Sequence, residues 1–222
     1  MLKQQKMSSP DKFIKFPDRD IRRNYFPVKN EVMEMRLPWK NLAVYLYLVY
    51  RFQCRLGHRD DYPANIAEVF GIAKSTAKRT LDQLFEDNFI YTVGPMIFPA
   101  HYIPDYEEEP RHFFPLPREL FSLGLNMGEV AMYAYLMYKE DREDYSCMVS
   151  RTDFYDAMEM SSNKVGDVVR TLEDKHFIHT SRTEVRRWDG KLRNGKLKFR
   201  VLMIESAKKR LVEMQLQNVQ AQ

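Results

Sequence analysis

Cationic and hydroxyl side chains gather in two stretches of this chain, and both have the chemistry needed to contact a polyanion. In the first stretch, which follows Gly71, a helical spacing turns one apolar stripe inward and leaves the opposite face to Lys74, Ser75, Thr76, Lys78 and Arg79. Lys and Arg can pair with guanine edges, and Ser and Thr can bond to bases or phosphates. The spacing predicts a helix face that could read DNA, with an ordinary exposed helix face as the alternative.

The second stretch, from Thr180 to Arg200, has eight Lys or Arg residues against two acidic ones. This local excess of six positive charges is larger than the net charge of +4 of the whole chain. Asp189-Gly190 and Asn194-Gly195 favour tight hairpin turns, so the stretch predicts a long basic hairpin. A solvated loop is the alternative, but clustered positive charge is typical of a phosphate contact. We expect DNA contacts from Arg182, Arg186, Arg187, Lys191, Arg193, Lys196 and Lys198.

The elements that must position these residues occur twice. Residues 25–92 align without a gap on residues 113–180, at a constant offset of 88 that places Phe26-Pro27 on Phe114-Pro115 and Leu84 on Leu172. A period of this length indicates one small unit that has been duplicated. Each copy is therefore expected to contain the same order of helices and strands.

In the second copy, apolar spacing predicts helices over Gly128–Asp141 and Arg151–Glu159 and a third that begins at Ser161 or Ser162. Its third helix turns valines and a leucine inward, so we expect DNA contacts on the other face from Ser162, Asn163, Lys164 and Arg170. Gly166 and Asp167 weaken this second face, because one loosens the helix and the other repels phosphate.

Three helices followed by a hairpin is the order of a winged helix-turn-helix unit, whose third helix enters a major groove. The first copy fits the same order, with Pro63 at the start of its second helix, a turn at Gly71, and a hairpin from Ile90 to Ile103 around Gly94-Pro95. Ala73 replaces the capping residue Ser161 of the second copy. The first hairpin contains no Lys or Arg and is rich in Phe and Tyr, so it is better suited to protein contact.

The fold class expected from these elements is mainly α with small β-hairpins, arranged as two tandem winged helix-turn-helix domains. The predicted divisions are a basic N-terminal arm at 1–24, winged-helix domain 1 at 25–104, an acidic linker at 105–112, winged-helix domain 2 with the long basic wing at 113–204, and a C-terminal helix or tail at 205–222. No apolar run approaches the roughly 20 residues that span a bilayer, and no secretion signal is evident, so we expect a cytoplasmic protein. Cys54 and Cys147 show no metal spacing and are expected to be buried thiols.

Signals for an enzyme are weak. The tyrosines of the first helix in each copy could stack bases or act as a nicking nucleophile, but their helical context favours core packing: Tyr45, Tyr47, Tyr50, Tyr133, Tyr135 and Tyr138. His176 and His179 lack the further ligands that a metal site needs. We expect no catalytic residue, no metal and no cofactor.

Phe113-Phe114-Pro115-Leu116-Pro117-Arg118-Glu119-Leu120-Phe121, followed by residues 125–136, resembles the opening of winged-helix proteins of Gram-positive plasmids and integrative elements. These include the N-terminal region of the replication initiator protein A family. The resemblance covers both copies and implies a double winged helix that binds origin or operator DNA.

The expected function is sequence-specific binding of double-stranded DNA by an initiator-like or regulatory factor of a bacterial mobile element. One alternative is a transcriptional repressor. Another is a protein-interaction scaffold with tandem winged helices that barely contacts DNA. The expected partners are DNA and, through the uncharged first wing, a second copy of the chain or a replication or regulatory protein.

Overall fold

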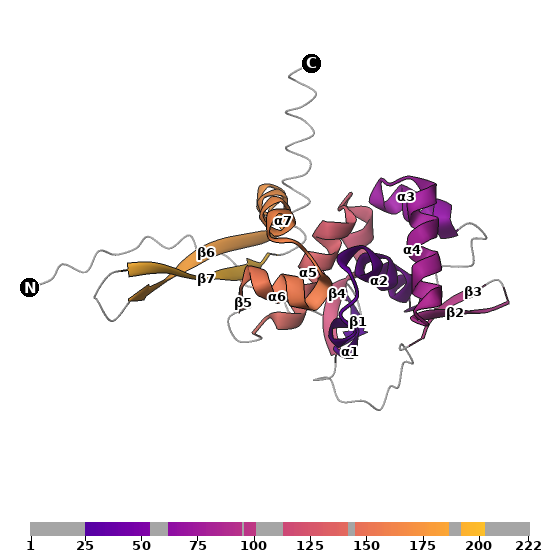
Figure 1. The fold of residues 1–222 in the computed structure, drawn as a ribbon, viewed down its shortest axis with the longest axis horizontal. Coiled ribbons are helices and arrows are strands. Elements are labelled where there is room, and N and C mark those ends of the chain that lie inside the picture. The colour runs from indigo at the N-terminus through magenta and orange to yellow at the C-terminus, as the bar shows by residue number, and fades with distance from the viewer. Residues whose placement is uncertain are drawn as a thin grey trace, which may run out of the picture.

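The computed structural model describes residues 25–53, 62–94, 96–100, 113–141, 145–186 and 192–202, with the backbone alone for 182–186 and 192–196. Within these residues the chain combines seven α-helices with small antiparallel sheets (Figure 1). The predicted arm, linker and C-terminal tail lie outside the described residues, as does Cys54. None of the described helices has the length and apolar character needed to cross a membrane.

The two copies have matching elements. The first contains β1 (Tyr25–Lys29), α1 (Glu31–Glu34), α2 (Trp39–Gln53), α3 (Tyr62–Phe70), α4 (Lys74–Glu86), β2 (Ile90–Val93) and β3 (Met96–Pro99). The second contains β4 (Phe113–Pro117), the 3₁₀ helix η3 (Arg118–Ser122), α5 (Met127–Lys139), β5 (Ser146–Val149), α6 (Arg151–Met158), α7 (Ser162–Asp174), β6 (Ile178–Arg186) and β7 (Leu192–Val201). The offset of 88 carries β1 onto β4 and α4 onto α7, residue for residue.

Strands β1 and β4 are features that the sequence did not predict, and they pair with each other. The ladder is antiparallel, and Pro27 faces Pro115 at its centre. Proline is usually evidence against a strand because it cannot donate to a ladder. Both strands of a two-stranded ribbon are edges, however, and two opposed prolines are tolerated where the backbone N–H positions point outward.

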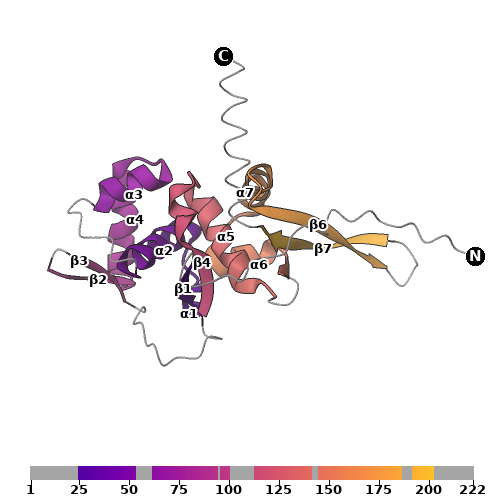
Figure 2. The ribbon, with the colours of Figure 1, turned by 180° about the vertical axis from the view of Figure 1, so that it is seen from behind.

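Beside this ribbon, α2 and α5 pack against each other at the centre of the molecule. Figures 1 and 2 show α3, α4, β2 and β3 on one side of the pair and α6, α7, β6 and β7 on the other. Phe121 of η3 reaches across into the first copy, where its ring lies 5.0 Å from that of Tyr50, 5.4 Å from Tyr47, 6.3 Å from Phe70 and 6.4 Å from Phe26. The buried apolar residues of both copies thereby form one continuous core.

Side chains at the helix starts fix the second copy. Asn126 accepts from the Glu129 N–H at 3.1 Å while the Glu129 carboxylate accepts from the Asn126 N–H at 2.8 Å, a reciprocal cap of α5. Ser150 and Asp153 form the same arrangement at α6. At α7, Ser161 accepts from the Lys164 N–H, as its position predicted. Ala73 gives α4 no side-chain cap.

The two hairpins differ in size. In the first copy β2 and β3 form a short hairpin around Gly94. Gly94 has a φ of +60°, a conformation that favours glycine because glycine has no Cβ. In the second copy β7 is the central strand of a three-stranded sheet, with β6 on one side and the unpredicted β5 on the other. β5 thus pairs with β7 and adds a third strand at the base of the long hairpin, which the sequence pattern did not predict.

The expected turn at Asn194-Gly195 is wrong. Asn194 lies within β7 opposite Glu184. Between Arg182 and Glu184 the register shifts, and β7 contains one residue more than β6 over this interval. The Asn-Gly pair therefore lies at a bulge, where glycine is also favoured. The other turn signal, Asp189-Gly190, lies outside the described residues.

Most helix predictions are confirmed within two residues. The helix expected over Gly128–Asp141 begins one residue earlier and ends at Lys139, and the one expected over Arg151–Glu159 ends at Met158. Cys147 is buried, as expected of a structural thiol. The coarse fold class, helices with small antiparallel hairpins, is that of the described residues.

Candidate nucleic-acid interface

Helix α4 follows α3 after a sharp turn. Gly71 has a φ of +62°, and the Ile72 N–H donates to the Ala67 carbonyl at 3.0 Å, which closes the C-terminus of α3. Ala77, Leu81 and Leu84 then fix one face of α4 in the core. The opposite face exposes four of the five predicted residues, Lys74, Ser75, Lys78 and Arg79. Thr76 is half-buried, so the prediction that it points outward is only partly correct.

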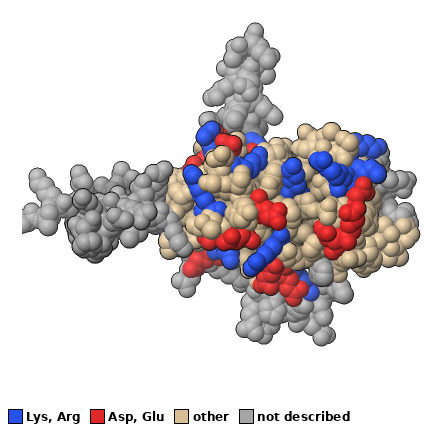
Figure 3. All heavy atoms as spheres, in the orientation of Figure 1, with Lys and Arg blue, Asp and Glu red and all other residues tan. Residues whose placement is uncertain are grey.

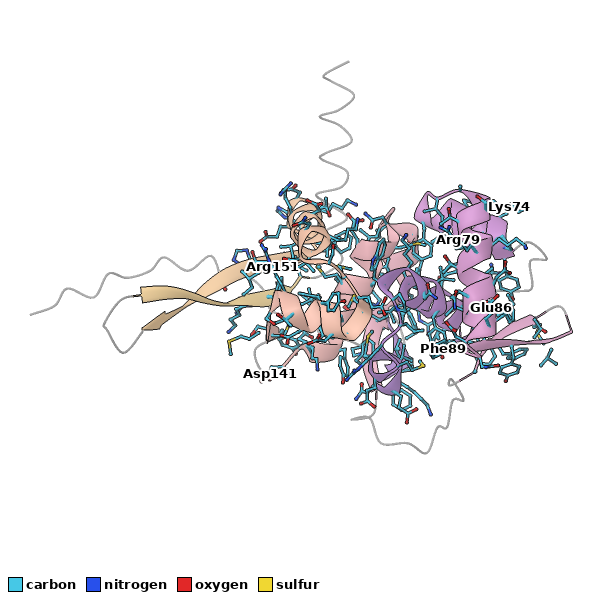
Figure 4. All side chains as sticks on the ribbon, in the orientation of Figure 1. Lys74, Arg79, Glu86, Phe89, Asp141 and Arg151 are labelled. Atoms are coloured by element: carbon cyan, nitrogen blue, oxygen red, sulfur yellow. The ribbon has the colours of Figure 1, made fainter. Side chains whose placement is uncertain are left out.

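Charge is divided along α4. Its N-terminal half contains the three cations of this face, and its C-terminal end exposes Asp82, Glu86 and Asp87. Figure 4 shows Lys74 and Arg79 toward the upper end of the helix and Glu86 toward the lower end. Lys78 lies 3.4 Å from Asp82, an exposed i,i+4 pair of little strength. A polyanion is therefore attracted to the N-terminal half, where the helix dipole is also positive.

Helix α7 presents a weaker version of this face. Ser162, Asn163 and Arg170 are exposed, as predicted, but Arg170 lies 4.0 Å from the Asp167 carboxylate. Lys164 departs from the prediction because it is half-buried, with its ammonium 5.3 Å from the centre of the Trp39 ring. An apolar stem and a cation–π contact hold this lysine against the first copy. It is therefore a contact between the copies as well as a cation near α7.

Two cations near α7 escaped the sequence prediction. The Arg151 guanidinium at the start of α6 donates to the Ser162 hydroxyl at 3.2 Å, which places an exposed Arg beside the first turn of α7. The exposed Lys40 lies 5.2 Å from the same Trp39 ring that Lys164 contacts. The sequence could have indicated Arg151, because this residue lies in the first turn of α6, the helix that precedes α7. No pattern along the chain linked Lys40 to α7.

The basic hairpin is the third part of the surface. The backbones of Arg182 and Arg186 lie in β6, and those of Arg193 and Lys196 lie in β7, whereas Arg187 and Lys191 fall outside the described residues. Lys198 is half-buried in β7, between Ser181 on β6 and Met148 on β5. Since its neighbour Phe199 is fully buried, Lys198 lies on the outer face of the sheet.

Figure 3 shows how charge is distributed on the face turned to the viewer. Lys and Arg side chains lie over the upper part of the α4 region, and Asp and Glu lie below them. Further Lys and Arg side chains lie over α7, mixed with acidic ones. The basic surface thus includes the starts of both equivalent helices, with α4 more uniformly positive than α7.

The first hairpin has a different surface. Tyr91 and Phe98 face each other across β2 and β3 with nearly parallel rings 5.6 Å apart, and Val93 faces Met96 on the same side. Tyr91 is 47% exposed and Val93 is 52% exposed. This side of the hairpin is apolar and suited to protein rather than phosphate.

Four of the six tyrosines of α2 and α5 are core residues, as predicted, and the other two, Tyr50 and Tyr138, are half-buried against the core. Tyr45, Tyr47, Tyr133 and Tyr135 are buried. Burial, with a smaller contribution from the nearby Asp153 carboxylate, raises the pKa of Tyr135 to about 12. A nucleophile needs a depressed pKa or an adjacent base, so this environment is unfavourable for tyrosine chemistry.

Comparison with known proteins yields no assignment. No protein-family model matches this chain, and no curated protein matches it in sequence.

Proposed function

We propose that this protein binds double-stranded DNA through two winged helix-turn-helix units, by contact alone and without covalent chemistry. The element order of each copy supports the proposal, because a third helix with an exposed polar face precedes a hairpin in both. In this assignment α4 enters a major groove with its N-terminal half. The hairpin of β6 and β7 lies along the neighbouring phosphates.

One observation carries the proposal: the polar face of α4. Its three cations and Ser75 are exposed together at the end of the helix where the dipole favours anions, while acidic residues occupy the other end. A merely solvated face has no need of this separation. Arg and Lys at this end could pair with guanine edges, which gives sequence preference.

The biological role that best fits is an initiator-like or regulatory factor of a bacterial mobile element. It is supported by the resemblance of residues 113–136 to the replication initiator protein A family. A transcriptional repressor would use the same surface and differ only in the DNA site.

Replacement of Arg79 tests the reading of bases by α4. We expect Arg79→Ala to cost about 1–3 kcal/mol on the preferred sequence and much less on random duplex, because a base-edge contact is sequence-specific. Gln83→Ala, exposed on the same helix, is the matched control and should leave both affinities unchanged. Selection from a random-sequence pool, followed by fluorescence anisotropy on selected and random duplexes, measures the difference. Equal losses on both duplexes would exclude Arg79 from base reading.

The exposed apolar side of the first hairpin favours a second candidate, a scaffold that binds other proteins. Tyr91 and Val93 are its most exposed residues. If this candidate holds, Tyr91→Ser with Val93→Ser abolishes association with a protein partner, and the unmodified protein does not bind duplex even at low salt. DNA binding that these two replacements leave intact would instead support the first proposal.

A further inference from the structure

The ladder between β1 and β4 is symmetric under exchange of the two copies. The offset of 88 converts the pair Phe26↔Leu116 into Phe114↔Val28, which is also a pair of the same ladder. Pro27↔Pro115 converts into itself. A ladder with this property has a local twofold axis through its central pair, since only a twofold rotation exchanges two strands and restores the same contacts.

The helices beside the ribbon obey the same relation. α2 and α5 are equivalent by the offset, and they pack on each other rather than each on a different surface. Ring contacts recur in both copies: Phe26 lies 5.5 Å from Tyr50, and Phe114 lies 5.7 Å from Tyr138. The copies therefore meet through the same patch on each, as the subunits of a symmetric dimer do, and are not stacked in series.

This symmetry determines how the two candidate recognition helices face a ligand. The offset of 88 makes α4 and α7 equivalent, so the rotation that relates the ribbon strands would place the N-terminal ends of both helices at the same height along its axis and on the same side. Figures 1 and 2 show the two helices on opposite flanks of the central ribbon and of α2 and α5. One chain thus presents two helix starts in the arrangement that a twofold-symmetric dimer offers to DNA.

We infer that the preferred DNA site consists of two half-sites in inverted orientation, bound by the two copies of one chain, an inference that rests on the DNA binding proposed above. A twofold axis perpendicular to the duplex exchanges its two strands, so equivalent residues of α4 and α7 contact opposite strands. Copies related by translation along the duplex would contact the same strand and require a direct repeat.

The half-sites differ in base sequence because the helix faces differ. Lys74, Ser75, Lys78 and Arg79 in α4 correspond to Ser162, Asn163, Gly166 and Asp167 in α7. The two copies therefore contact opposite strands and their phosphates in a symmetric way, but the bases that they contact differ. Of the two helices, α4 contributes more of the base preference. A natural site of this kind would not read as a palindrome.

Site-specific photocross-linking tests the strand assignment. Ser75→p-benzoylphenylalanine and Asn163→p-benzoylphenylalanine, each in the otherwise unmodified chain, change exposed equivalent positions. Each protein is irradiated with a duplex that the unmodified protein selects from a random pool and whose two strands have different labels. We expect the main cross-links of the two positions on opposite strands. Cross-links on the same strand, or from Ser75 alone, overturn the inference.

A chimera provides an independent readout. Ser162→Lys, Asn163→Ser, Gly166→Lys and Asp167→Arg give α7 the outward residues of α4, and a Cβ at Gly166 would meet no atom within 4 Å. We expect the chimera to select an inverted repeat of a single half-site, and a direct repeat overturns the inference. If the unmodified protein selects no duplex at all, the proposed function itself fails, which separates the two outcomes.

Discussion

At the scale of residues, a buried ion pair distinguishes the two copies. The Lys175 ammonium lies 2.9 Å from the Glu129 carboxylate, whose side chain is 1% exposed and which also caps α5. The equivalent positions in the first copy are Asn41 and Asp87. The first copy therefore lacks both members of the pair, and its Asp87 is exposed, so no charge is left buried there without its partner.

Removal of one member should be costly. We expect Lys175→Met to lower the free energy of unfolding by about 3 kcal/mol, because the Glu129 carboxylate stays buried without its cation. The double replacement Glu129→Gln with Lys175→Met should recover part of this loss. Urea denaturation of the unmodified protein, of each single variant and of the double variant measures the coupling. Lys78→Met is the matched control, since the pair of Lys78 with Asp82 is exposed, and it should change stability by less than about 0.5 kcal/mol.

The raised pKa of Tyr135 leads us to expect that the free energy of unfolding falls at high pH. Burial raises its pKa in the folded protein to about 12 from the ordinary value of 10.0, so the folded state holds the phenolic proton more tightly than the unfolded state. This contribution is complete below the unfolded pKa and is lost as pH rises through the interval between the two values. Tyr135→Phe should reduce the decline in unfolding free energy between about pH 9 and about pH 12, measured by urea denaturation. An unchanged decline would contradict the assignment.

At the scale of elements, periodicity along the chain predicted α2 to α7 well because each buries a continuous apolar stripe. The strands β1 and β4 were missed for a physical reason. Pro27 and Pro115 oppose strand formation locally, and only the pairing of two distant segments makes them acceptable. A sequence repeat shows that two units are alike, but it contains no information on how they are oriented.

The same limit applies to the candidate site. The exposed faces of α4 and α7 followed from helical spacing, and Lys74, Ser75, Lys78 and Arg79 lie where expected. The half-buried position of Lys164 depends on Trp39, which is distant in the sequence and belongs to the other copy. Helical spacing therefore could not predict the contacts between the two copies, which only the structure shows.

Phe121 tests the shared core. Its ring lies near four aromatic rings of the first copy, so Phe121→Ala should lower the free energy of unfolding by about 3–5 kcal/mol. Because both copies contribute to one core, we expect a single unfolding transition that moves as a whole, followed by circular dichroism during thermal denaturation. Tyr155→Ala, an exposed aromatic of the second copy, should have little effect. Two separate transitions, with only one shifted, would contradict a common core.

At the scale of the whole molecule, the net charge of +4 conceals an uneven distribution. Positive charge lies at the start of α4 and along the sequence of the β6–β7 hairpin, and the end of α4 is acidic. Figures 1 and 2 show the two hairpins extending in opposite directions from the central helices. One hairpin is basic in sequence and the other presents an apolar side, so the two copies differ most in their hairpins.

The most direct test of DNA binding is a salt titration of affinity for random duplex, measured by fluorescence anisotropy. We expect the logarithm of the binding constant to fall linearly with the logarithm of salt concentration, by roughly 0.9 for each phosphate neutralised. Replacement of Arg186, Arg187 and Lys191 by Ala should weaken binding to all sequences and reduce this slope by roughly 1 for each phosphate that these side chains no longer neutralise. Absence of binding at low salt, or a slope that these replacements leave unchanged, would contradict the account.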